Sequence, residues 1–160
     1  MKKFMQKKLK NEKGMTLIEL LAVIVILAII AAIAVPAISG IIENSRVGAV
    51  KSDAINIINA AELYDTEAIP GDEVSLAQLE TAGFIKDAGS FAGLTTDEKD
   101  DVKVNLTNNA LTGTNKELNG ITITFSAATK AIISSYPNST RGSGDNDLVF
   151  TIGPNPATED

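Results

Sequence analysis

The dominant pattern in the chain is a nearly unbroken apolar segment followed by a helical alternation of apolar and polar residues. Leu, Ile, Val and Ala dominate residues 15–42, and about 20 residues from Thr16 to Val35 would span roughly 30 Å, the thickness of a bilayer's hydrocarbon core. Apolar residues then recur at spacings of three and four, which predicts an amphipathic helix with one buried stripe. The stripe consists of Val47, Val50, Ala54, Ile57, Ile58 and Ala61.

Together these patterns predict one helix from Thr16 to about Tyr64, roughly 73 Å long. Its first half, residues 15–42, would lie in a membrane, and its second half, residues 43–64, would form part of a head. Pro36 removes a backbone donor and crowds the preceding turn, so it should kink the helix, and Gly40 should loosen it further. We expect the helix to bend or melt locally there.

After the long helix, turn residues divide the chain into short elements. Ser75–Gly83 predicts a short helix with Ser75 as N-cap, Gln78 in the capping-box position and Gly83 just past its end. Thr95–Asp101 predicts one more helical turn. The period then changes to two, which predicts four strands at residues 102–106, 121–125, 130–136 and 147–152.

The expected fold is therefore α+β, with the long helix packed on a small antiparallel sheet of about four strands. The head would cover residues 43–152, with an irregular segment at 65–101, the sheet at 102–152, and an extended tail at 153–160.

Charge is distributed unevenly and indicates orientation in a membrane. Six of the 14 basic residues are lysines within residues 1–14, and 19 of the 20 acidic residues follow Met15. Residues 15–160 thus carry 8 basic and 19 acidic side chains, a formal charge of −11. The positive-inside bias keeps the lysines cytoplasmic and exports the remainder. An acidic body would repel phosphate backbones, so direct nucleic-acid binding is not expected.

The absence of cysteine and histidine narrows the possible chemistry. Thiolate metal sites, nucleophilic thiols and the commonest general base are all missing. The carboxylates are scattered in loops, so we expect neither an enzyme nor a cofactor. A weak calcium candidate, Asp145 and Asp147, lies in a polar turn that needs no metal to explain it.

A single carboxylate, Glu19, stands near the start of the apolar segment. A charged side chain at the centre of a bilayer costs on the order of 2.5–3.5 kcal/mol even on the mildest insertion scale. Glu19 must therefore sit at the membrane edge or have a partner. Two interpretations remain open: a capping box with Thr16 at the helix start, or an ion pair with the amino terminus of another copy of the chain.

The stretch Gly14-Met15-Thr16-Leu17-Ile18-Glu19, after a basic leader and before an apolar run containing Pro36, resembles the prepilin signature of type IV pilins and pseudopilins. The resemblance is close over about residues 8–45. Met15 departs from the Phe that is commoner in the family. The absence of cysteine departs from the disulfide-closed loop of Gram-negative pilins and fits a Gram-positive producer better.

The resemblance implies that a membrane-embedded prepilin peptidase removes the leader, residues 1–14, by cutting between Gly14 and Met15, and methylates the new amine of Met15. It also implies a homopolymer built with an assembly ATPase and a membrane platform protein. The chain would begin as a single-pass precursor in the cytoplasmic membrane and end in a fibre on the cell surface. Adhesion, motility, aggregation and DNA uptake are the uses of such fibres.

Two alternatives accompany this interpretation. The first is a pseudopilin of a type II secretion or competence apparatus, which shares the signature. The second is a soluble binding domain released after an ordinary secretory signal, because Ala32-Ile33-Ala34 fits an A-x-A cleavage pattern. The mature chain would then begin at Val35 instead of Met15.

Overall fold

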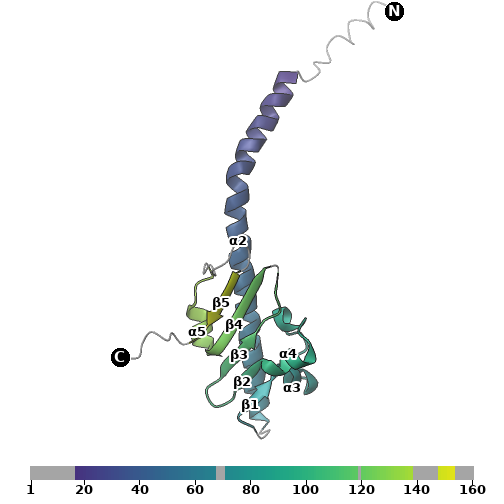
Figure 1. Cartoon of the computed structure of the whole chain (residues 1–160), viewed down its shortest axis with the longest axis vertical. Coiled ribbons are helices and arrows are strands. Elements are labelled where there is room, and N and C mark those ends of the chain that lie inside the picture. Colours follow the sequence, from purple (N-terminus) through teal and green to yellow (C-terminus); the bar gives the residue numbers. More distant parts are fainter. Residues whose placement is uncertain (1–16, 68–70, 119, 139–147, 154–160) are drawn as a thin grey trace, which may run out of the picture. The chain divides into compact units, whose positions relative to one another are not determined.

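A computed structural model of the chain describes residues 17–67, 71–118, 120–138 and 148–153. The chain divides into two units, Met1–Ile41 and Ile42–Asp160. We call the second unit the head. One helix contributes to both units (Figure 1).

Helix α2 runs from Leu17 to Thr66, which confirms the predicted long helix and places its end two residues later than expected. The predicted stripe is also confirmed, since all six of its residues are buried in the head. One face of the helix thus supplies a large part of the head core, as expected when apolar residues recur every three or four positions.

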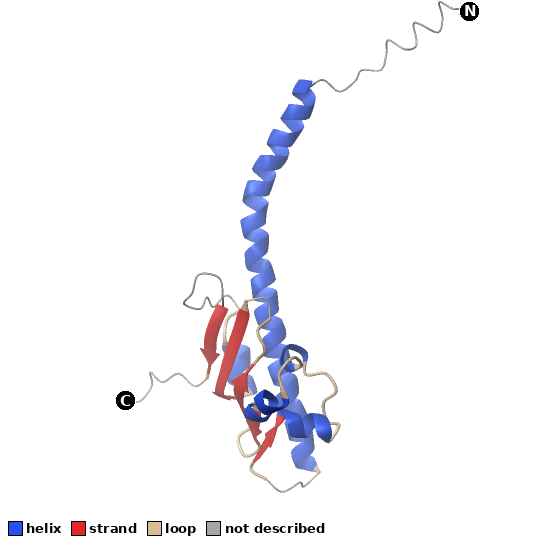
Figure 2. Ribbon diagram, turned by 45° about the vertical axis from the view of Figure 1, so that its right-hand side comes forward, coloured by secondary structure: helices blue, strands red, loops and turns tan. Residues whose placement is uncertain are grey.

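The sheet of the head has five strands, not four, in the order β1-β2-β3-β4-β5. Figure 2 shows the strands in red and the helices in blue. Strands β1 to β4 pair antiparallel in sequence, whereas β4 and β5 pair parallel. The prediction of an all-antiparallel sheet is therefore wrong at one edge. The bounds are β1 Glu73–Ser75, β2 Lys103–Asn105, β3 Ala110–Thr114, β4 Ile121–Ala128 and β5 Leu148–Ile152.

Residues 130–136 were expected to form a strand but form helix α5, Lys130–Ser135. Thr129 is its N-cap, and its hydroxyl accepts a hydrogen bond from the Ile132 amide at 3.4 Å. Parallel strands cannot be joined by a tight hairpin and need a crossover, which α5 supplies between β4 and β5. The two errors, a strand predicted at residues 130–136 and an all-antiparallel sheet, therefore have the same cause, which is the helical crossover between β4 and β5.

Strand β3 lies inside residues 107–120, which were expected to be a connector. Its pairing with β4 shifts register between Leu111 and Gly113. Gly113 has φ +144°, and a Cβ there would meet the backbone of Val102. The glycine and the bulge interrupt the alternation by which a strand is recognised in a sequence.

The segment between α2 and β2 contains the two short helices that the sequence predicts, and also a strand and a 3-10 turn that it does not predict. It contains β1, helix α3 (Leu76–Thr81), a 3-10 turn at Gly89–Phe91 and helix α4 (Thr96–Asp101). The capping box of Ser75 and Gln78 is confirmed. Gly83 has φ +82° just past the end of α3, where the Phe84 amide donates to the Leu79 carbonyl at 3.0 Å, so the predicted helix end is confirmed too.

The core of the head lies between α2 and the sheet, and short segments close its ends. Phe91 and Phe125 are fully buried with ring centroids 6.0 Å apart. The side chain of buried Asn115 forms hydrogen bonds with the backbone of β4. Its Oδ1 accepts from the Ile123 amide at 2.6 Å, and its Nδ2 donates to the Ile121 carbonyl at 3.3 Å. Helices α3 and α4 lie together near the β1 end, and α5 lies near β5 (Figure 1).

The 3-10 turn at Gly89–Phe91 is held against α2 by Asp53, whose Oδ2 accepts from the Ser90 amide at 2.8 Å. Gly89 has φ +56°, and a Cβ there would overlap the Asp53 carboxyl group. We therefore predict that Gly89→Ala destabilises the head through both left-handed strain, about 1–2 kcal/mol, and this overlap.

Gly83→Ala is the matched control, because Gly83 is also left-handed but has nothing within 4 Å of its Cβ position. Urea unfolding of the full chain in detergent should show a larger loss for Gly89→Ala than for Gly83→Ala. Equal losses would contradict a close contact between Gly89 and Asp53.

A second capping box holds α4. Glu98 Oε2 accepts from the Thr95 amide at 2.7 Å and from the Thr95 hydroxyl at 3.0 Å. These hydrogen bonds hold the pKa of Glu98 below its ordinary value. The stabilisation is therefore complete above the ordinary carboxyl pKa and is lost as the pH falls through the lower pKa of the folded state.

We predict that Glu98→Gln flattens the acid branch of thermal stability against pH, recorded between about pH 5 and pH 3. Gln keeps an oxygen acceptor but does not titrate. Asp97→Asn, one position away and outside the capping box, is the control. If Glu98→Gln lost stability at low pH as the unmodified chain does, the Glu98 carboxylate would not be the group through which the capping box responds to pH.

Candidate membrane and assembly segment

The first half of α2, from Leu17 to Ile41, is apolar on every side. Its large hydrophobic side chains are all substantially exposed, from Leu17, at 87% exposed, to Ile41, at 67%. The most apolar 18-residue window of the helix has a mean hydropathy of 3.1 and no buried residue. A helix that is hydrophobic all round is stable only inside a membrane or a protein core. By length and composition this one can cross a membrane.

Glu19 is the only charged residue between Leu17 and Ile42 and lies in the first turn of α2. A carboxylate is favourable in that position because the first turn carries the positive end of the helix dipole and unpaired N–H groups. The structure therefore places an acid at the N-terminal end of an apolar rod, where its charge is best tolerated.

Pro36 lies inside α2, which continues on both sides of it. A proline leaves the carbonyl four residues earlier without its usual donor. Three residues later, the Ser39 hydroxyl donates to the Val35 carbonyl at 3.1 Å, an additional bond of the kind that accompanies bent helices. Gly40 has open space at its Cβ position. A kink or local melting at these residues stays a prediction for the assembled state.

Other predicted site residues lie outside the described residues. These are Gly14, Met15 and Thr16 at the predicted cleavage site, and the weak calcium candidate Asp145 and Asp147. The Thr16–Glu19 capping box is therefore still a prediction. Within the described ranges, no group of three or more His, Cys, Asp or Glu residues could hold a metal ion.

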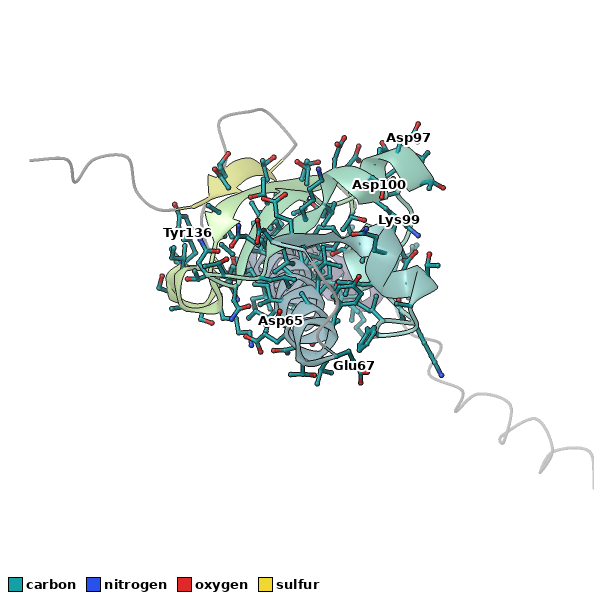
Figure 3. All side chains as sticks on the ribbon, turned by 90° about the horizontal axis from the view of Figure 1, so that it is seen from below. Asp65, Glu67, Asp97, Lys99, Asp100 and Tyr136 are labelled. Atoms are coloured by element: carbon teal, nitrogen blue, oxygen red, sulfur yellow. The ribbon has the colours of Figure 1, made fainter. Side chains whose placement is uncertain are left out.

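Acidic side chains are prominent on the head surface. Figure 3 shows Asp97 and Asp100 on α4 and Asp65 and Glu67 near the end of α2, with Lys99 beside Asp100. Lys99 forms an ion pair with Glu80 of α3 at 2.8 Å. A hollow of about 450 Å³ is lined by Tyr64, Ala77, Gln78, Thr81, Ala82 and Asp100. Gln78 belongs to the cap of α3, and Asp100 Oδ1 accepts from the Ser75 hydroxyl at 3.0 Å, so these groups serve local structure.

One buried charge was not found by sequence reasoning. Lys51 is 8% exposed and lies on the core side of α2. In the sequence it stands between apolar stripe residues as a polar residue, and the pattern gives no sign that it is buried. Its nitrogen donates to the Tyr136 carbonyl at 2.5 Å and to Asn138 Oδ1 at 2.9 Å. Both partners lie more than 80 residues away, so no local pattern could have indicated them.

Comparison with known proteins gives one match. A family model described as the prokaryotic N-terminal methylation motif matches residues 9–35, which include the predicted cleavage site, Glu19 and most of the apolar segment. No curated protein and no solved structure matches the chain. The family of this motif is structural and not enzymatic.

The matched residues include the end of the basic leader and most of the exposed apolar half of α2. Its position agrees with the resemblance found in the sequence, and the long helix on an α+β head agrees with the architecture that the resemblance implies. The chain therefore carries, over residues 9–35, the prepilin signature of type IV pilins and their pseudopilin relatives.

Proposed function

We propose that this protein is the structural subunit of a type IV pilus, stored in the cytoplasmic membrane and polymerised into a surface fibre through the first half of α2. The observation that carries the proposal is the exposed apolar segment from Leu17 to Ile41, which coincides with most of the methylation motif. Removing one Leu or Ile side chain from water contributes about 1.5–3 kcal/mol, so this surface drives insertion into the membrane and requires neighbouring subunits to cover it once it has left the lipid.

Leader removal links these two stages. The six lysines of residues 1–14 hold the precursor in one orientation, because positive residues stay on the cytoplasmic side. Cleavage between Gly14 and Met15 by a prepilin peptidase deletes those charges and leaves one α-ammonium group on Met15, which the same enzyme methylates. Gly14 suits the cleavage because a residue without Cβ lets the backbone approach a protease closely.

In the fibre, the new ammonium group of one subunit pairs with Glu19 of its neighbour. The first-turn position of Glu19, among side chains that are otherwise all apolar, supports this pairing. Apolar helices slide past one another with little preference, whereas a stranded buried charge costs about 3–5 kcal/mol. The pair therefore sets the axial register, and the apolar contacts supply most of the association.

The course of α2 also supports anchoring over release. The helix runs without interruption from Ala32 through Val35, where a secretory signal peptidase would have to cut, and continues into the core of the head. Cutting there would remove the apolar half of a helix whose other half the head needs. An intact α2 keeps the head attached to its anchor.

Substitution at Gly14 tests the processing step. Gly14→Val should leave an uncut precursor in the membrane fraction, because a branched side chain obstructs the approach of the backbone to the peptidase. Asn11→Ala, elsewhere in the leader, is the control and should be cut normally. An immunoblot separates the forms by the mass of residues 1–14. Normal cutting of Gly14→Val would contradict the proposed cleavage site.

Substitution at Glu19 tests the register pair. Glu19→Val should be cut and inserted, since it makes the segment more apolar, but its yield in sheared surface fibres should fall by more than about tenfold. Glu19→Asp keeps the charge and should retain more fibre than Glu19→Val. Fibre yield is measured by immunoblot of the sheared fraction. A fibre yield from Glu19→Val equal to that of the unmodified chain would contradict the register pair and leave Glu19 with the role of a helix cap alone.

A further inference from the structure

We infer that helix α5 is a strap across α2 which opens as a unit, and that Lys51 closes it by capping its C-terminal end from another helix. The inference concerns the head alone and does not depend on the proposed function. Its elements are one buried lysine, one short helix and two polar ties between α5 and α2.

Helix α5 is too short to be stable by itself. It has six residues, and isolated helices shorter than about 12–15 residues are marginal in water. Its N-terminus has a local cap in Thr129, but no basic residue lies in its own last turn. The Ile132 carbonyl accepts from the Tyr136 amide and the Ser135 hydroxyl, so the carbonyl groups after it are the ones left for water or for a donor from elsewhere in the fold.

Lys51 supplies that donor. Its ammonium group donates to the carbonyl of Tyr136, the C-cap residue of α5, and to the side chain of Asn138 just beyond it. A cation at a helix C-terminus is also favoured by the helix dipole. Figure 3 shows Tyr136 on the side of the head away from Asp97 and Asp100, so the acidic α4 does not compete for Lys51.

The contact is closely fitted. Lys51 is the only buried charged side chain in the part of the chain that the structure describes. Burial lowers its pKa, so the buried ammonium depends on its two acceptors. One turn earlier on α2, a Cβ on Gly48 would lie 3.1 Å from Asn138 Nδ2. Glycine at position 48 thus leaves room for Asn138 beside Lys51.

A second tie lies at the other end of α5. Lys130 pairs with Glu62 at 2.6 Å. Lys51 and Glu62 are three helical turns apart and lie on the same face of α2, with Ile55 and Ile58 between them. The face thus has polar ends and an apolar middle, and α5 matches it with buried Ile133 and half-buried Ile132.

The two ties differ in strength. The side chains of Lys130 and Glu62 are 35% and 38% exposed, and such pairs contribute little because water competes for them. Lys51 is only 8% exposed, so water competes less for its ammonium group. Loss of Lys51 should therefore release α5, whereas loss of Glu62 should only fray its first turn. Strand β5 stays in place through its five-residue ladder with β4.

Hydrogen–deuterium exchange of the full chain in detergent, read by peptide mass, tests this inference. In Lys51→Met, amides of residues 130–136 should exchange at least about tenfold faster, while those of β2 to β4 change less than about twofold. Lys51→Arg keeps a donor and should restore most of the protection. Glu62→Gln should accelerate exchange less than Lys51→Met.

Asn138→Ala provides a second variant that leaves the core intact, since Asn138 is exposed and only one of the two acceptors is lost. It should accelerate exchange in residues 130–136 to an intermediate extent. Unchanged exchange there in both Lys51→Met and Asn138→Ala would overturn the inference. Equal acceleration across α5 and the sheet in Lys51→Met would also overturn it, because α5 would then not open as a separate unit.

Discussion

Between Leu17 and Ile41, helix α2 exposes apolar side chains on every side and carries a single charge at Glu19. Water cannot cover such a surface without a large free-energy cost, so either lipid or other apolar helices must do so. In the proposed function, lipid covers this surface in the precursor and neighbouring subunits cover it in the fibre. Glu19 limits both arrangements, because a carboxylate in hydrocarbon needs the membrane edge or a cation. The proposed cleavage after Gly14 would create such a cation at Met15.

The same helix changes character within a few residues. Up to Ile41 it is apolar all round, and from Val47 onward it buries one stripe and exposes polar residues on its other faces. One continuous helix thus suits two surroundings: the first half can cross a membrane by length and composition, and the second half forms part of the head core. The head adds a sheet, three short capped helices and the buried lysine that holds α5.

Local signals predicted most of the head, and long-range pairing explains what they missed. The stripe of α2, the cap at Ser75 and the helical turn at Thr95–Asp101 depend on residues close together in the chain, so they could be recognised in the sequence. Residues 130–136 were assigned to a strand, whereas in the structure Thr129 caps a helix there. The parallel edge could not be predicted, because β5 pairs with a strand some 20 residues earlier. Lys51 has partners 85 and 87 residues away. The assembly motif is contiguous, which is why Gly14, Met15 and Glu19 could be proposed from sequence alone.

The central claim is that the apolar half of α2 remains on the mature chain and ends in a processed amine. Mass spectrometry of the N-terminal peptide, taken from material sheared off the cell surface, tests this most directly. The account predicts a chain that begins at Met15 and carries a methyl group on its α-nitrogen. A surface chain that begins at Met1 or at Val35 would contradict it.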